Sequence, residues 1–560
     1  MLYKSFAEAS RRLMLGIHPA VLERRFNRLL AATLSLLSAS LALWYASSVG
    51  LIPLNPSSLL PLIMISCLIA CSFLVLSLKP ILDYKSHLSR LYRESPWALL
   101  AGTVYAFAGL SPLKVIDVLA RQDALPAVRH ELQRIERDRA LRLEGRVEAL
   151  VKEAREARGY WRDLLSTIAG LERTGGDVRG AFRDLYKSAM SMLRAENEAT
   201  ASRMATFAHT ALIMGAILPV TMYVMLAIIA STATSALAPM LTAMSALLSV
   251  VMCFMADGMA PDSGPLYGDV YKRIAVRYAP IALAVALVLG LWFAYVPWLY
   301  KYRLTIPVLA GIMAFSLPGW LEFKRHAAAL DEIFYGTPAL LRDVADEVRR
   351  GQSPVQALAR LSEDRSYGPH MDRFLRLLVN KVRLQGPARA LADLKPYLPK
   401  QVYTSLSLLF DADELGASPE TFDVLADVMR DYADSVRTYK RRVSAVRWTA
   451  FLTVGIGLGI SVYLFGTVLR QIALAGDKLA SIKAGGAAVS VPITISIVRT
   501  EDLPAIKDAI LSGLCLTGGF IGIMGGKAAD FRIGSGLRDA FINSAIILVS
   551  IVIGGLIGWI

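Results

Sequence analysis

The chain has 560 residues, of which 55% are hydrophobic and 19% are charged, and its formal net charge is +15. Long uncharged blocks alternate with charge-rich stretches, so the composition excludes an ordinary soluble multidomain protein and predicts a polytopic membrane protein. The four cysteines lie in apolar blocks without CxxC or Cys–His spacing, which favours buried hydrophobic side chains over redox or metal-binding roles.

Residues 1–28 form a polar, basic segment without the pattern of a cleavable signal peptide, so we expect membrane insertion to rely on the spans themselves. Nine apolar stretches then have the length of roughly 20 residues that crosses a ~30 Å hydrocarbon core. The predicted spans are residues 29–50, 58–78, 207–231, 236–256, 279–299, 303–321, 448–469, 507–525 and 540–560. The eighth is rich in glycine, which suits close helix packing in lipid but makes its ends hard to define.

Positive charge sets the predicted orientation. Residues 1–28 hold six Lys and Arg against two Glu, whereas the loop 51–57 is uncharged, so the N-terminus is expected in the cytoplasm. Counting crossings from there places both large polar segments inside and the polar stretch 471–506 outside. The predicted organisation is a cytoplasmic basic N-terminus (1–28), spans 1–2 (29–78), a first cytoplasmic helical domain (79–206), spans 3–6 (207–321), a second cytoplasmic helical domain (322–447) and spans 7–9 (448–560).

The two predicted cytoplasmic domains repeat one set of motifs. Three motifs of the first segment return in the second at a fixed offset of 242 residues, and a glycine returns at 241. The pairs are Ser95-Pro96 with Thr337-Pro338, Gly109 with Gly351, Ser111-Pro112 with Ser353-Pro354, and Gly175 with Gly416. We interpret this regularity as duplication of one helical-bundle domain. The predicted fold class is therefore an all-α integral membrane protein with about nine transmembrane helices and two duplicated cytoplasmic helical bundles.

Each repeated motif has a local physical reason. A Ser/Thr-Pro pair supplies an N-cap hydroxyl and a proline at the first helical position, so these pairs predict helix starts. Gly109 and Gly351 can end the preceding helix in a left-handed conformation, and Ser353 with Gln356 has capping-box spacing. For any single Gly or Pro, a folding role is favoured over contact with a ligand. The charge-rich stretch from Arg129 to Arg162 is interpreted as a solvated helix face.

Motifs for enzyme chemistry are missing from the sequence. Gly525-Gly526-Lys527 comes nearest to a phosphate-binding loop, but Ala528 replaces the required Ser or Thr. The chain contains no HExxH or GxSxG and only six histidines, so we predict no catalytic, cofactor or metal site. The spans are also nearly free of ionisable groups, which disfavours a permease or channel.

These motifs resemble those of the platform proteins of type II secretion and type IV pili, with the archaeal archaellum or pilus branch as the closer likeness. The residues that carry the resemblance are Gly109–Pro112 and Arg173–Asp177 in the first segment, and Pro338–Leu341, Gly351–Leu358, Gly386–Leu391 and Glu414–Pro419 in the second. The chain departs from the bacterial pattern in having nine predicted spans rather than about three. The second segment also lacks the double glycine that Gly175-Gly176 provides in the first.

The resemblance implies a platform in the cell membrane that couples a cytoplasmic assembly ATPase to extraction of pilin-like subunits. It implies that the platform itself has no catalytic activity, no cofactor and no nucleic-acid partner. The rival hypothesis is a membrane permease or channel with cytoplasmic regulatory domains, and the oligomeric state, monomer or homodimer, stays open. The motif residues with a structural or partner-binding role are Gly109, Ser111, Pro112, Gly175, Gly176, Gly351, Ser353, Pro354 and Gly416. A membrane-edge basic cluster, in which lipid anchoring is favoured over ATPase contact, comprises Lys440, Arg441, Arg442 and Arg447.

Overall fold

The protein is helical throughout its described part. The computed structural model describes residues 19–48, 56–213, 268–295, 302–463, 503–530 and 532–556, together with isolated positions that include Arg12. No β-strand occurs among these residues, which confirms the all-α prediction. The chain divides into two compact units, Met1–Ser191 with Asp411–Thr421, and Met192–Phe410 with Phe422–Ile560.

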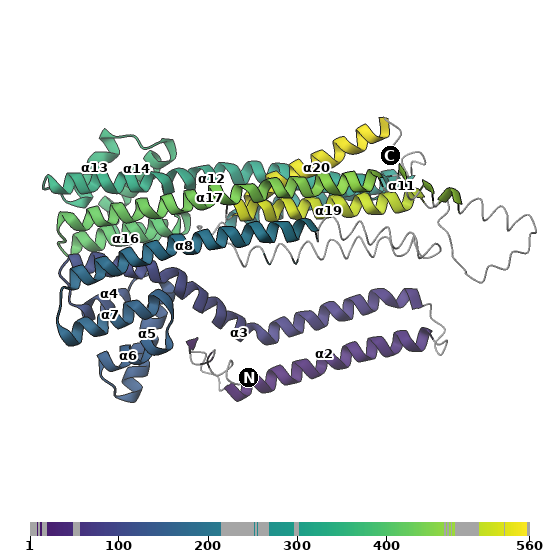
Figure 1. The fold of residues 1–560 in the computed structure, drawn as a ribbon. Helices are drawn as coiled ribbons and strands as arrows, with labels where there is room; N and C mark the ends of the chain where they lie inside the picture. The colour runs from purple at the N-terminus through teal and green to yellow at the C-terminus, as the bar shows by residue number, and fades with distance from the viewer. Residues whose placement is uncertain are drawn as a thin grey trace, which may run out of the picture. The chain divides into compact units, whose positions relative to one another are not determined.

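The first unit begins with two long helices, α2 (Pro19–Ser48) and α3 (Pro56–Phe107), which pack against each other (Figure 1). They include the predicted first and second spans. Four shorter helices follow, α4 (Pro112–Leu119), α5 (Pro126–Arg142), α6 (Arg146–Glu156) and α7 (Gly159–Thr174). The long helix α8 (Val178–Leu212) then begins in the first unit and ends in the second. The end of α3 is the centre of this unit, because Leu99, Val104 and Tyr105 are completely buried there.

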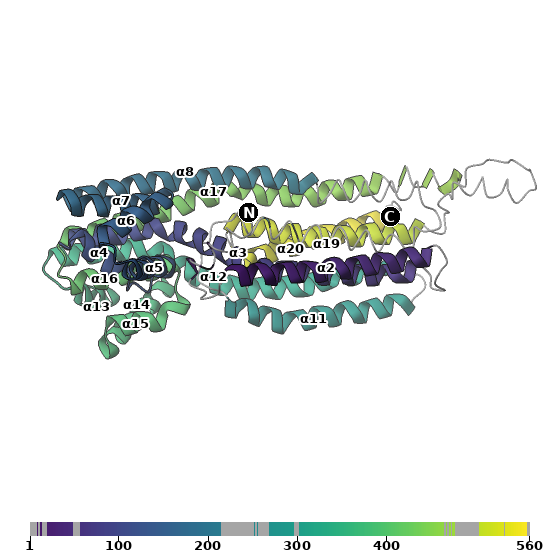
Figure 2. The same cartoon turned by 90° about the horizontal axis from the view of Figure 1, so that it is seen from below.

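Among the described residues of the second unit, five helices are long and apolar enough to cross a membrane: α11 (Gly268–Tyr295), α12 (Thr305–Arg349), α17 (Pro419–Tyr463), α19 (Leu503–Asp530) and α20 (Ile533–Leu556). They coincide with the fifth to ninth predicted spans. Helix α11 lies alongside α12 (Figure 2) and exposes Leu283, Leu287 and Leu291, as a lipid-facing helix does. Most of the predicted spans 207–231 and 236–256, and of the polar stretch 471–506, lies outside the described residues.

The short helices of the second unit follow the order of those in the first. They are α13 (Pro354–Asp364), α14 (Pro369–Gln385), α15 (Pro387–Leu394), the 3-10 helix η3 (Lys395–Tyr397) and α16 (Lys400–Glu414). Helices α13, α14, α15 and α16 begin 241 to 243 residues after α4, α5, α6 and α7, as Pro126 and Pro369 illustrate. In each segment a long helix precedes the set and another follows it.

The pairs Ser95-Pro96 and Thr337-Pro338 do not start helices, so the prediction is wrong at these two places. Pro96 lies inside α3 and Pro338 inside α12. The Ser95 hydroxyl donates to the Leu91 carbonyl at 2.6 Å, and the Thr337 hydroxyl donates to the Ile333 carbonyl at 2.7 Å. Each hydroxyl thus bonds within the turn that the proline disturbs. Burial of the flanking apolar residues outweighs the cost of about 3 kcal/mol for a proline inside a helix.

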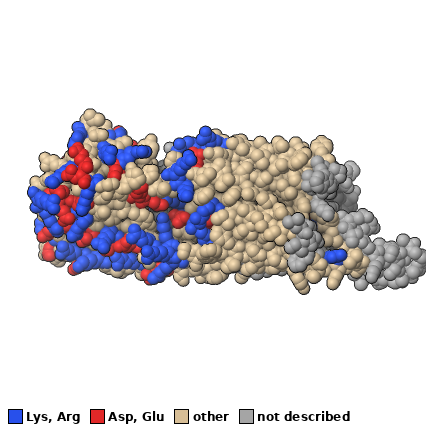
Figure 3. All heavy atoms as spheres, turned by 90° about the horizontal axis from the view of Figure 1, so that it is seen from above, with Lys and Arg blue, Asp and Glu red and all other residues tan. Residues whose placement is uncertain are grey.

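Long helices carry the chain from apolar to charged surroundings without a break. Helix α12 is uncharged from Thr305 to Leu321 and charged from Glu322 onward, and α17 is charged up to Arg447 and uncharged afterwards. The domain boundaries predicted at 321/322 and 447/448 therefore mark changes in chemistry inside single helices. Figure 3 shows Lys, Arg, Asp and Glu gathered over one part of the surface, while most of the remaining described surface carries few of them.

Carboxylates on the long helices cap a helix start in both segments. Glu94 of α3 accepts hydrogen bonds from the backbone N–H groups of Ala127 (2.7 Å) and Val128 (3.1 Å) in the first turn of α5. Glu332 of α12 accepts equivalent bonds from His370 (2.9 Å) and Met371 (3.3 Å) in the first turn of α14. A negative charge at this position also interacts favourably with the helix dipole.

Helices α19 and α20 approach each other through glycines. A Cβ on Gly522 would lie 2.5 Å from the Ala540 backbone nitrogen, and one on Gly526 would overlap the backbone of Gly536. Small residues allow such close contact in lipid, where no hydrophobic force drives helices together. The eighth predicted span is thus a continuous helix with a well-buried apolar segment. The Gly525–Lys527 sequence, which partly matches a phosphate-binding loop, lies within this helix.

We predict that Gly526→Ala destabilises the protein because the added methyl group forces α19 away from α20. The expected cost is roughly 1–3 kcal/mol, as for other overpacked sites. Gly459→Ala in α17 is the matched control, since a Cβ there meets nothing within 4 Å, and alanine favours helix. Thermal unfolding of both full-length variants in detergent measures the effect. Equal midpoints for the two variants would contradict the close-packing account.

Candidate functional site

The repeated glycines form the turns between helices. Gly109 and Gly351 adopt positive φ angles of 84° and 92°, and Gly175 and Gly416 adopt 61° and 64°. A Cβ on any of these four would meet nothing within 4 Å, so backbone conformation, not space, requires glycine. Gly176 follows Gly175 directly, in the link between α7 and α8. The predicted left-handed ends at Gly109 and Gly351 are confirmed.

The two Ser-Pro motifs at Ser111 and Ser353 start helices, as predicted. Ser111 and Ser353 are extended N-cap residues, and Pro112 and Pro354 occupy the first helical position of α4 and α13. The predicted capping box forms at Ser353 and Gln356, with both hydrogen bonds at 3.3 Å. These residues therefore build turns within the segments, in agreement with the folding role preferred from sequence.

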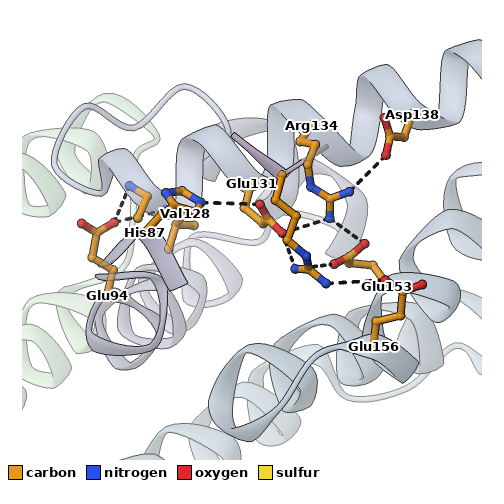
Figure 4. A network of polar contacts seen from close by, with 10 residues as sticks. His87, Glu94, Val128, Glu131, Arg134, Asp138, Glu153 and Glu156 are labelled. Atoms are coloured by element: carbon orange, nitrogen blue, oxygen red, sulfur yellow. Dashed lines mark hydrogen bonds and ion pairs between the residues drawn. The ribbon is translucent and has the colours of Figure 1, made fainter. Parts of the chain in front are cut away.

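A buried charge network occupies the first unit between α5 and α6. The Arg134 guanidinium, only 1% exposed, contacts Glu131 at 2.9 Å, Glu153 at 2.6 Å and Asp138 at 3.1 Å, and Figure 4 shows it among them. Arg12 approaches Glu131 at 3.0 Å and Glu153 at 3.2 Å. The basic N-terminal segment thus contributes one cation to the interior of this unit.

The carboxyl group of Glu131 is the centre of the network. Its side chain is completely buried, which by itself would raise its pKa, but the interactions with His87, Arg134 and Arg12 hold the pKa at about 2. Oε1 receives both arginines, whereas Oε2 faces the imidazole of His87 at 3.7 Å (Figure 4). Glu131 is therefore ionised at neutral pH.

The interpretation of residues 129–162 as a solvated face is wrong at its central positions. The stretch forms α5, α6 and the start of α7, and Glu131, Arg134 and Glu153 are buried among these helices. The sequence contains the spacing of the Glu131–Arg134 pair, but i,i+3 charge pairs are equally common on exposed helices. The buried network needs α6 and Arg12 to come close to α5, and sequence spacing does not report either contact.

A second polar cluster, within the first unit, connects α3 to the segment that leads into the Gly416 turn. Tyr105, which is completely buried, donates a hydrogen bond to Asp411 Oδ2 at 2.7 Å, and Gln122 donates to the same oxygen at 2.8 Å. Burial raises the pKa of Asp411 against the lowering effect of these two bonds. Although Gly416 was predicted within the domain 322–447, its turn belongs to the compact unit of the first segment.

The membrane-edge basic cluster separates into residues with different partners. Arg447 is 20% exposed and contacts Asp530 at 2.7 Å and Asp539 at 2.8 Å. Lys440 lies 3.8 Å from Asp331, and Arg442 lies 3.0 Å from Glu198, while Arg441 is exposed. Arg447 therefore joins α17 to α19 and α20, and Lys440 and Arg442 also have acidic neighbours within the second unit.

Each segment holds an exposed leucine that was not predicted from the sequence. Leu143 ends α5 and is 94% exposed, with a φ of 55° that is uncommon for a residue with a side chain. Leu384, in the last turn of α14, is 87% exposed. Their surroundings match, because Arg142-Leu143-Glu144-Gly145 corresponds to Arg383-Leu384-Gln385-Gly386 at an offset of 241. An exposed side chain held in a strained backbone points to a role outside the fold.

Fold and sequence comparison together define a multi-pass membrane protein with a secretion-type domain. Residues 100–227 match the family model for the type II secretion system (T2SS), protein F. No curated protein and no solved structure matched the chain significantly. A type II secretion system F domain at residues 100–227 confirms the resemblance seen in the motifs.

We predict that Arg134→Ala destabilises the protein strongly because Glu131 and Glu153 lose a cation that they share. Breaking a buried pair costs about 3 kcal/mol or more. Arg139→Ala, which removes a partly exposed partner of Glu136, should cost less than about 1 kcal/mol. Thermal unfolding of the full-length variants compares the two, and adding Glu153→Gln to Arg134→Ala should recover part of the loss. Similar midpoints for Arg134→Ala and Arg139→Ala would refute a buried network.

Proposed function

We propose that this protein is the cell-membrane platform of a type IV pilus, archaellum or type II secretion-like machine. In this role both charge-rich segments face the cytoplasm and engage an assembly ATPase, while the membrane helices contact pilin-like subunits. The platform itself performs no catalysis and transmits the work of the ATPase to subunit extraction. The observation that carries the proposal is the secretion F match at residues 100–227, within a chain of long apolar helices.

The repeated helix order supports a duplicated cytoplasmic domain. Corresponding helices begin 241 to 243 residues apart, and the turns at Gly109 and Gly351 share a positive φ. A carboxylate from the preceding long helix, Glu94 or Glu332, caps α5 or α14. Two copies of one domain would offer two related surfaces to an ATPase with repeated subunits.

Continuous helices suit the proposed transmission of force. Because α12 and α17 extend from uncharged into charged sequence without a break, a displacement of the charged part moves the apolar part with it. Ion pairs of Arg447 with Asp530 and Asp539 connect α17 to two further apolar helices. A permease, the rival hypothesis, would instead need ionisable or polar groups that line a path for its substrate.

The exposed leucines provide the sharpest test of ATPase contact. Each lies beside an arginine, and an apolar side chain among charges is a typical anchor of a protein interface. Asparagine tolerates a positive φ better than leucine does, so Leu143→Asn should leave the fold intact or stabilise it slightly.

We predict that Leu143→Asn combined with Leu384→Asn weakens binding of the secretion ATPase from the same genome at least about tenfold, without lowering thermal stability. Co-purification and ATPase stimulation with the full-length platform in detergent measure the effect. Leu377→Asn, at a partly exposed position of α14, is the control and should retain binding. If the wild-type protein neither binds nor stimulates the ATPase, the platform function is wrong. Solute flux through the purified protein in liposomes without any ATPase would favour the permease.

A further inference from the structure

Three polar atoms without a hydrogen-bond partner converge beside the charge network of the first unit. They are Nε2 of His87, Nδ1 of His130 and Oε2 of Glu131, and each is inaccessible to solvent. The two imidazole rings have their centroids 4.9 Å apart, and one candidate ligand atom from each of the three residues lies within 4.8 Å of the other two. Buried polar atoms normally have partners, so three unsatisfied atoms on neighbouring side chains need an explanation.

Direct hydrogen bonds do not satisfy these atoms. His87 Nε2 and Glu131 Oε2 are 3.7 Å apart, which is too long for a hydrogen bond, and His130 Nδ1 also has no hydrogen-bond partner within the described part of the chain. The other oxygen of Glu131 already accepts from Arg12 and Arg134, so the carboxylate is held with Oε2 towards the rings. A small ligand that accepts lone pairs from two nitrogens and one oxygen would satisfy all three atoms.

We propose that His87, His130 and Glu131 bind a transition-metal cation of the Zn²⁺ class. Two imidazoles with one carboxylate form a known zinc donor set, and imidazole disfavours Mg²⁺ and Ca²⁺. Donor atoms around a tetrahedral zinc ion are about 3.4 Å apart for bond lengths near 2.1 Å, so the present spacing must contract by little more than about 1 Å. A water molecule would take the fourth position.

The carboxylate donor is available to a cation. Oε1 of Glu131 accepts from Arg12 and Arg134, whereas Oε2 has no hydrogen-bond partner among the described residues. Because His87 is on α3 and the other two donors are on α5, the metal would fasten the long helix to the first short bundle. The site stands independently of the proposed platform function.

Titration of the untagged full-length protein in detergent with Co²⁺ tests the site. We expect one equivalent to bind with the visible absorption of a tetrahedral cobalt complex, and Zn²⁺ to displace it. His87→Gln and His130→Gln should each weaken binding at least about tenfold, whereas His326→Gln, at a half-buried histidine of α12, should not. His130→Cys replaces one donor by another and should add a thiolate-to-cobalt charge-transfer band, which a variant that merely misfolds would not show.

Saturable binding that is lost in both glutamine variants and retained in His326→Gln supports the proposal. Absence of saturable Co²⁺ or Zn²⁺ binding to the wild-type protein overturns it. Wild-type affinity in His87→Gln and His130→Gln, or loss of binding in His326→Gln, overturns it as well, because the ion would then occupy another place. Normal ATPase binding by the His130→Gln variant would separate this result from the proposed function.

Discussion

The structure depends on the requirement that a backbone in lipid satisfy its own hydrogen bonds. Helices meet that requirement within a single segment, so each apolar stretch of the described chain becomes helical. In α12 and α17 the helix then continues into charged sequence, and Pro318, just before the boundary in α12, lies inside the helix and does not end it. Membrane anchor and charged domain are therefore parts of the same helices, and no flexible linker separates them there.

Two different interactions hold these helices in place. Within the apolar part, where lipid is as apolar as leucine, close packing through glycines such as Gly522 and Gly526 joins α19 to α20. Near the boundary between uncharged and charged sequence, Arg447 pairs with Asp530 and Asp539. At the start of α12, Asp508 of α19 caps the helix by accepting a hydrogen bond from the N–H of Thr305 at 2.9 Å. The polar contacts fix how these helices align along their axes, and the glycines allow the short distance between α19 and α20.

Much of this fold could be predicted from sequence because its signals are local. The uncharged blocks predicted apolar helices, and Gly109, Gly351 and the Ser353–Gln356 capping box predicted turns that the structure contains. The pairs Ser95-Pro96 and Thr337-Pro338 were wrongly predicted as helix starts because the same local signal suits a helix start and a helix interior. Both Ser95 and Thr337 are completely buried inside long helices. The charge network of Glu131 depends on three separate segments, and the exposure of Leu143 depends on tertiary packing, so neither is visible in residue spacing.

The proposed platform function requires both charge-rich segments to lie on the cytoplasmic side of the membrane. Single cysteines at exposed positions, Ser166→Cys in α7 and Ala388→Cys in α15, test it in a background whose four native cysteines are replaced by alanine. A membrane-impermeant maleimide should label neither position in intact cells and both after the membrane is permeabilised. Labelling of either cysteine in intact cells would place that segment outside and contradict the platform.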